Sequence, residues 1–214
     1  MDVRLVSWAC AVKSRRRMRA PIIWLFTDPV RTPDVLGAVR ALPPGCGIVF
    51  RHDGVPGRCG LARAVLAVCR AGRHQMVMTA PTIAGVGLHI RAGRRPDARP
   101  LPALVTSSAH SRLEVMRARR MGATVVFLSP MFATASHVGV PGLGRLQWSR
   151  AGRGLGGLLA LGGVSSQTAR ALPPDCLGFG AIGALADCVP SATVFHDCHS
   201  GVPVTVADGG LARQ

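Results

Sequence analysis

Two glycine-rich turns near the end of the chain are the clearest candidates for a binding site. Each follows an apolar run, 158–164 or 177–184, that predicts a strand leading into a helix. Backbone N–H groups at such turns suit a phosphate, because no side chain blocks its approach and a helix dipole favours an anion. The alternative is that the glycines only let helices pack closely on the strands. The residues concerned are Gly162, Gly163, Gly180 and Ala181.

The elements that must position these turns follow a regular alternation of apolar runs and amphipathic runs. The expected strands are 22–26, 47–50, 75–78, 85–90, 103–108, 124–128, 158–164 and 177–184. Strands alternating with helices predict an α/β protein with a closed parallel sheet, the (β/α)8 TIM barrel, whose last two turns commonly hold a phosphate. Residues 79–84 are too few for a crossover helix, so an irregular third connection is expected.

An open doubly wound sheet is the alternative fold. The first turn after a strand, Thr27-Asp28-Pro29, lacks the glycines of a dinucleotide-binding motif, which favours the barrel.

The length of 214 residues suits one barrel domain, which we place at residues 21–187. Residues 1–20 predict a basic amphipathic helix covering the bottom of the barrel, with a membrane-surface helix as the alternative. Residues 188–214 lack periodicity and predict an irregular tail. Its Cys188, His196, Cys198 and His199 match no structural zinc spacing.

The location of the protein is predicted from what the sequence lacks. No apolar run reaches the roughly 20 residues of a membrane span, and no secretory signal is visible. The seven cysteines form no CxxC pair and predict reduced thiols. We therefore expect a cytoplasmic protein with no membrane partner.

The net charge of +16 raises nucleic acid as a partner. However, arginine is spread along the chain, and aromatic residues, at 4%, are not interleaved with it for base stacking. We expect no specific nucleic-acid partner, only nonspecific attraction to phosphate backbones.

A series of short motifs runs in order along residues 24–187. They are Trp24–Asp28, Phe50–Asp53, Gly85–Leu88, Ser108–Ser111, Ser129–His137, Ala160–Val164 and Gly178–Ile182. In this order and spacing they resemble the motifs of the thiamine-phosphate synthase family and its relative, the thiazole tautomerase. Pro130 resembles the synthase, because the tautomerase has a histidine there.

The resemblance implies an enzyme of thiamine biosynthesis that joins a phosphorylated thiazole to a pyrimidine diphosphate. In such a transferase the thiazole nitrogen attacks the pyrimidine methylene and diphosphate leaves with help from Mg²⁺. Barrels of this family often dimerise, so a homodimer is possible. The alternatives are a non-catalytic or regulatory barrel that binds thiazole phosphate, and a tautomerase-like enzyme.

The resemblance also assigns residues to the site. The two glycine-rich turns would hold the thiazole phosphate, together with the hydroxyls of Thr134 and Ser136. Arg51 matches the family's arginine, and Ser108 could face the pyrimidine or the diphosphate. His110 is a candidate polar residue of the site, or else a histidine bonded to backbone near a helix start. The expected catalytic residues are Arg51, Ser108 and His110.

The metal site departs from the family pattern. Its acidic positions correspond to Thr79-Ala80 and Ala84, and its lysine position is Asp53. Protein-bound Mg²⁺ normally has one or two carboxylate ligands. Asp28 and Asp53, at the ends of two expected strands, are therefore the candidate Mg²⁺ ligands. Alternatively, arginines replace the charge of the metal.

Overall fold

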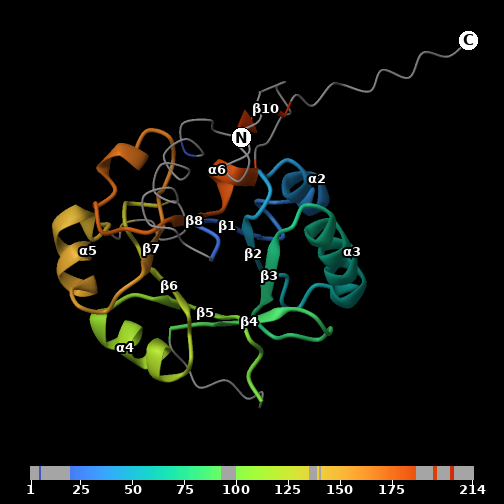
Figure 1. The fold of residues 1–214 in the computed structure, drawn as a ribbon, viewed down its shortest axis with the longest axis horizontal. Helices are drawn as coiled ribbons and strands as arrows, with labels where there is room; N and C mark the ends of the chain where they lie inside the picture. The colour runs from blue at the N-terminus through green and yellow to red at the C-terminus, as the bar shows by residue number, and fades with distance from the viewer. Residues whose placement is uncertain are drawn as a thin grey trace, which may run out of the picture.

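Eight parallel strands close into a barrel in which β8 pairs with β1 and every other strand pairs with its neighbours in chain order (Figure 1). The (β/α)8 barrel expected from the sequence is confirmed. The computed structural model describes residues 5, 20–92, 100–134, 139 and 141–186, and the backbone of 195–196 and 203–204.

The strands coincide with the short apolar runs of the sequence. They are β1 (Ile23–Phe26), β2 (Gly47–Phe50), β3 (Gln75–Met78), β4 (Gly87–Ile90), β5 (Val105–Ala109), β6 (Val125–Leu128), β7 (Leu158–Leu161) and β8 (Phe179–Ala181). Nearly all of their residues are buried. Both faces of a parallel sheet are covered, which is why the runs are apolar throughout instead of alternating.

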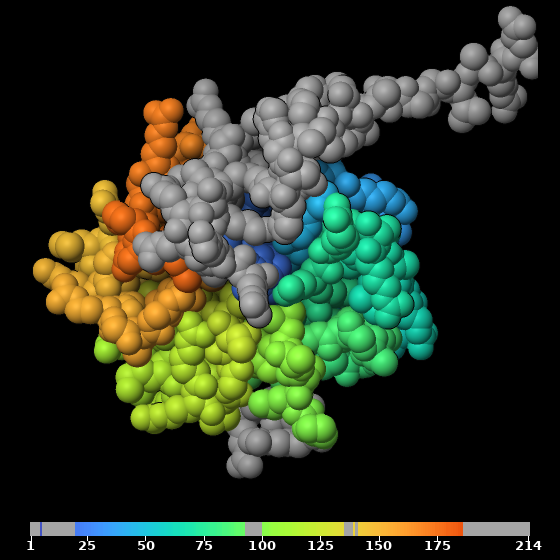
Figure 2. All heavy atoms as spheres, viewed as in Figure 1, coloured from blue at the N-terminus to red at the C-terminus, as the bar shows by residue number. Residues whose placement is uncertain are grey.

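The helices on the outside of the barrel are α2 (Val35–Arg40), α3 (Arg58–Ala71), α4 (Arg112–Arg120), α5 (Gly144–Gly152) and the short α6 (Gly183–Ala186). A side-chain cap begins α4, because the Ser111 hydroxyl accepts a hydrogen bond from the Glu114 N–H at 3.3 Å. In Figure 2, α2 and α3 form the blue to teal surface, opposite the yellow to orange surface of α5.

The helix expected between β7 and β8 is only the 3-10 turn η1 (Ala169–Ala171). The Thr168 hydroxyl donates to the Gly163 carbonyl at 2.9 Å and accepts from the Ser165 N–H at 2.9 Å. These side-chain bonds hold the segment in a compact turn and compete with an α-helical start.

The third connection, residues 79–86, contains no helix, as predicted. In Figure 1, α3 and α4 flank the side of the barrel where β4 lies, and the described residues that connect β3 to β4 and β4 to β5 contain no helix.

Aromatic side chains from opposite walls fill the barrel interior. The Phe127 ring lies edge-on to Trp24 at 5.5 Å and to Phe26 at 4.8 Å between ring centroids. Beside them, the His89 Nδ1 is 2.8 Å from the Thr106 hydroxyl. Burial, reinforced by the charges of Arg51 and Arg91, lowers the pKa of His89 to about 3, so the imidazole is neutral at pH 7.

The ends of the chain are described in part. Leu5 is helical and buried against the core, but the rest of the expected helix over 1–20 lies outside the described residues. The expected irregular tail includes a short antiparallel pair, β9 (Phe195–His196) with β10 (Pro203–Val204). No helix in the described part of the chain is long and apolar enough to span a bilayer.

Candidate functional site

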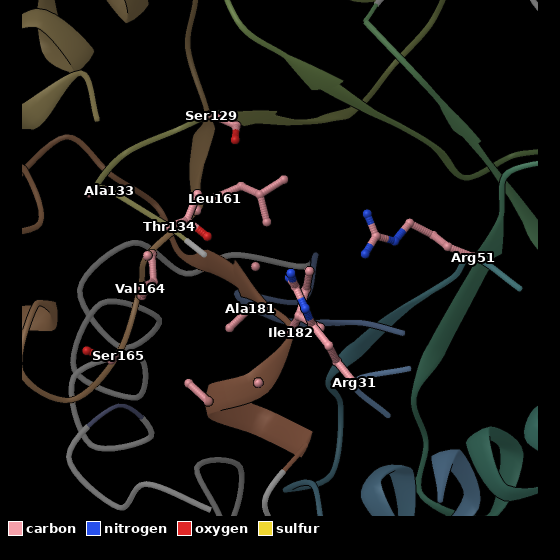
Figure 3. A pocket seen from close by; sticks show the side chains of 15 residues that line it. Arg31, Arg51, Ser129, Ala133, Thr134, Leu161, Val164, Ser165, Ala181 and Ile182 are labelled. Carbon is pink, nitrogen blue, oxygen red and sulfur yellow. The ribbon is translucent and has the colours of Figure 1, made fainter. Parts of the chain in front are cut away.

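A cavity of about 400 Å³ opens at the carboxyl ends of the strands (Figure 3). Active sites of (β/α)8 barrels lie at this end, and the volume suits a small organic ligand. Its walls come from the segments that follow β1, β2, β6, β7 and β8. They are Arg31, Arg51, Ser129, Ala133, Thr134, Leu161, Gly162, Gly163, Val164, Ser165, Gly180, Ala181, Ile182, Gly183 and Ala184.

The turn after β7 can be built only with glycine. Gly162 and Gly163 have φ of +92° and +65°, in the left-handed region. A Cβ on Gly163 would also stand 2.7 Å from the Phe132 Cβ and collide with the Ala133 carbonyl oxygen. The structure supports the packing interpretation of these glycines. The turn also lines the cavity, and its binding of a phosphate stays a prediction.

The loop after β6 is hydrogen-bonded to the end of β7. The Met131 N–H donates to the Leu161 carbonyl at 2.8 Å, and the Phe132 N–H donates to the Gly162 carbonyl at 3.1 Å. These two hydrogen bonds hold the loop against the end of β7. Thr134 lines the cavity, and its contact with a phosphate stays a prediction, whereas Ser136 lies outside the described residues.

Gly180, within β8, and Gly183, just after it, have different surroundings. A Cβ on Gly180 would stand 2.5 Å from the Phe26 ring, so this glycine is required by packing in the barrel interior. A Cβ on Gly183 would have no heavy atom within 4 Å. Gly183, which the sequence did not single out, is therefore a position of this wall with open space for a side chain.

Arg51 projects into the cavity from the end of β2 (Figure 3). Its Nε donates to the Thr27 carbonyl at 3.1 Å, and its guanidinium lies 5.3 Å from the centroid of the Phe26 ring. Burial lowers the pKa of Arg51, but the charge of Asp28 opposes that shift. The side chain is therefore a held cation aimed at the cavity, which fits its expected role on an anionic ligand.

Arg31 is a second cation at the cavity, and the sequence analysis missed it. It follows β1, and Figure 3 shows its guanidinium directed toward the same space as that of Arg51. The Asp28 Oδ1 accepts hydrogen bonds from the Val30 and Arg31 N–H groups, both at 3.1 Å. Its position three residues after Asp28, at the carboxyl end of the first strand, could have identified it.

Asp28 contacts both of these arginines, through the backbone of Arg31 and the side chain of Arg51. Its Oδ2 lies 3.9 Å from the Arg51 Nη2. Burial raises the pKa of Asp28, but the N–H groups of Arg31 and Val30 and the charge of Arg51 outweigh burial, so the pKa lies below its usual value. The carboxylate is thus ionised and stabilises the arginine-bearing end of the cavity.

Asp53 does not line the cavity and is held in a separate polar cluster. The Thr79 hydroxyl lies 2.6 Å from its Oδ1 and 2.8 Å from its Oδ2. Arg58 donates to Oδ1 at 3.0 Å, and Arg91 forms a short ion pair with Oδ2. Among the described residues, no group of three or more His, Cys, Asp or Glu side chains is placed to hold a metal ion.

Ser108 and His110 lie apart from the cavity walls. Ser108 pairs with Phe127 in the sheet, so its side chain is on the face of β5 that points into the barrel. His110 is exposed before α4, and its N–H donates to the Glu114 carboxylate at 2.7 Å. Their catalytic roles stay predictions.

Comparison with known proteins supports the fold. No protein-family model matches the sequence, and no curated protein is a significant match. Among solved structures, the YdjI aldolase from Escherichia coli K12 matches with a TM-score of 0.49 and 11% identity, over 85% of this chain and 80% of that chain. The thiamine phosphate pyrophosphorylase from Pyrococcus furiosus matches with a TM-score of 0.60 and 20% identity, over 78% of this chain and 87% of that chain. The resemblance seen in the motifs is thus confirmed at the level of the fold: the chain has the barrel fold of thiamine phosphate pyrophosphorylase.

Proposed function

We propose that this protein is a divergent thiamine-phosphate synthase-like enzyme that joins a phosphorylated thiazole to a pyrimidine diphosphate. One observation carries the proposal: the glycine turn after β7 and the guanidinium of Arg51 line the same cavity at the carboxyl ends of the strands. The motifs of the sequence and the fold shared with thiamine phosphate pyrophosphorylase add support.

The reaction requires two kinds of recognition. The thiazole nitrogen attacks the pyrimidine methylene, the carbon–oxygen bond to diphosphate breaks, and diphosphate leaves with the bonding electrons. The enzyme must therefore hold the thiazole phosphate in place and stabilise the charge that develops on the leaving group. Here the turns at Gly162–Ser165 and Gly180–Ala184 would hold the phosphate, and Arg51 would stabilise the diphosphate.

The residues of this chain do not fit the Mg²⁺ that the family resemblance implies. A diphosphate-bound Mg²⁺ needs carboxylate oxygens directed toward the ligand. Among the described residues that line the cavity, none carries a carboxylate. Asp28 is bonded to the loop that bears Arg31, and Asp53 is paired with two arginines. We therefore assign no step of the reaction to Mg²⁺.

A non-catalytic barrel that binds thiazole phosphate is the second candidate. The contacts of Asp53 favour this candidate. Asp53 is paired with Arg58 and Arg91 and hydrogen-bonded to Thr79, so this carboxylate is engaged within the protein and is not available to hold a metal on the diphosphate. A tautomerase finds less support, because it needs a base at the cavity and the exposed His110 does not line it.

A turnover assay tests the proposal. Purified protein is mixed with thiazole phosphate and the pyrimidine diphosphate, and thiamine phosphate is followed by its fluorescence after oxidation. We expect product from the native protein and from Arg63→Ala, an exposed substitution on α3, and a loss of product with Arg51→Ala. Absence of product, with thiazole phosphate still raising the melting temperature, would establish the binding barrel instead. Absence of both effects would overturn the phosphate site.

A further inference from the structure

We propose that the cavity binds the diphosphate group directly through Arg31 and Arg51, without a divalent cation. The inference rests on the proposed function, because it concerns the same cavity and names what replaces the metal.

The first argument is the placement of the two arginines. Arg31 follows β1 and Arg51 follows β2, and these strands are hydrogen-bonded neighbours in the barrel. Both guanidinium groups are directed into the cavity, on the side opposite the wall formed by Thr134 and Val164 (Figure 3). A ligand whose phosphate lay on the glycine turn would extend toward two cations.

The second argument is how Asp28 is used. Its Oδ1 holds the backbone at Val30 and Arg31, and its Oδ2 faces Arg51 at 3.9 Å. The carboxylate thereby keeps the two arginines in place and partly balances their mutual repulsion. A divalent cation at this carboxylate would stand beside two guanidinium groups, which repel it.

The third argument concerns the chemistry of the ligand. A guanidinium presents paired N–H donors in a plane, which match two phosphate oxygens at once. Diphosphate carries more charge and more acceptor oxygens than one monophosphate, so it can engage both arginines together. The cavity should therefore prefer inorganic pyrophosphate to inorganic phosphate at its arginine-lined end.

The experiment measures the binding of inorganic pyrophosphate by calorimetry, once in EDTA and once in excess Mg²⁺. Near-physiological salt suppresses nonspecific attraction to this chain of net charge +16. The variants are Arg31→Met and Arg51→Met, with Arg63→Met on α3 as the control. Melting temperatures without ligand show whether each variant is folded, and Arg31→Met, at an exposed position, keeps the test valid if Arg51→Met does not fold.

We expect pyrophosphate to bind in EDTA with an affinity within about threefold of that in Mg²⁺, and more tightly than phosphate. Each cavity variant should weaken binding at least about tenfold, because a charge-assisted contact is lost, and Arg63→Met should change nothing. Binding that requires Mg²⁺, or that is insensitive to Arg31→Met, would overturn the inference.

The outcome is separable from that of the proposed function. Thiamine phosphate formation that depends strictly on Mg²⁺ would uphold the synthase and refute direct binding. Metal-free binding of pyrophosphate through both arginines, in a protein that forms no product, would uphold the inference and refute the enzyme.

Discussion

Thr27 holds Arg51 through both its backbone and its side chain. The Arg51 Nε donates to the Thr27 carbonyl at 3.1 Å, and the Arg51 N–H donates to the Thr27 hydroxyl, also at 3.1 Å. The same hydroxyl lies 3.1 Å from the His52 Nδ1. One buried threonine thus fixes the direction in which the cation leaves β2, so it is a positioning residue for the cavity.

The first prediction follows from this contact. Thr27→Val keeps the shape of the side chain but leaves the partly buried Arg51 N–H without its acceptor, which should cost about 1–3 kcal/mol of unfolding free energy. Pyrophosphate affinity should fall several-fold as Arg51 loses its fixed direction. Chemical denaturation and calorimetry measure the two effects.

Thr32→Val is the matched control for that substitution. Thr32 is also buried, at 1% exposure, but its hydroxyl has no hydrogen-bond partner among the described residues. Removing an unpaired buried hydroxyl should leave stability unchanged or raise it slightly. Equal losses in the two variants would refute the positioning role of Thr27.

Substitution of Gly183 should separate ligand binding from folding. A side chain at this position would meet no heavy atom within 4 Å of its Cβ, so the fold should tolerate both Asp and Asn. Gly183→Asp places a negative charge at the phosphate wall and should weaken phosphate binding at least about tenfold, whereas the neutral Gly183→Asn should have a much smaller effect. Titration of thiazole phosphate by calorimetry checks this, and the phosphate would have to lie elsewhere if the two variants bound it alike.

Gly163→Ala should destabilise the protein. The left-handed φ of +65° and the collision with the Ala133 carbonyl together should cost at least about 2 kcal/mol. The comparison is Gly60→Ala on α3, where the new Cβ has open space and helix propensity should add about 0.5–1 kcal/mol of stability. Urea unfolding measures both, and a neutral Gly163→Ala would show that the turn is looser than the structure has it.

Acid should destabilise the fold through His89. Its pKa of about 3 in the folded barrel lies below the ordinary value of 6.5, so as the pH falls the unfolded chain takes up a proton before the folded chain does. The stabilisation is complete above about pH 6.5 and is lost progressively toward pH 3. Between pH 7.5 and pH 5 this group should cost about 2 kcal/mol.

The variant His89→Gln removes this titration while keeping a side chain able to reach the Thr106 hydroxyl. Its unfolding free energy should fall less steeply between pH 7.5 and pH 5 than that of the native protein. His52 and His74 should also contribute to the pH dependence that remains in this variant, because burial lowers their pKa values too. Identical slopes in the two proteins would mean that His89 is not the group concerned.

Asp53→Asn tests whether Asp53 serves a metal. The substitution weakens partly exposed ion pairs to Arg58 and Arg91, so stability should fall by no more than about 1 kcal/mol per pair. Pyrophosphate binding should stay within about threefold of the native value in EDTA and in Mg²⁺. A loss confined to the Mg²⁺ series would return Asp53 to the role of a metal ligand.

Much of the barrel could be predicted because each strand is recognised from its own short stretch of sequence. A strand buried on both faces needs a continuous apolar run, and 124–128 or 47–50 can be recognised without any partner. The turn after β7 was also identifiable, because successive glycines after such a run indicate a backbone that side chains would obstruct. The strand end at 177–184 was placed too far along, because Gly183 and Ala184 already belong to α6.

The arginine-lined end of the cavity could not be predicted in the same way. Arg31 follows the end of the first strand, but the direction of its side chain depends on the loop that Asp28 holds, which the sequence does not show. The ion pair between Asp53 and Arg91 could not be predicted from the sequence either, because the two residues are 38 positions apart and meet only when the barrel closes. The contact between His89 and Thr106 inside the barrel likewise depends on how the two strands pair, which the sequence alone does not show.

The pairing of Met131 and Phe132 with Leu161 and Gly162 has a consequence for engineering. These two segments, about thirty residues apart in sequence, are expected to act as one unit, because each supplies hydrogen-bond partners to the other. A chimera that received only the β7 turn from another barrel would lose the wall that bears Thr134 as well. Transplanting both segments together is the smallest exchange that would carry a new ligand preference into this scaffold.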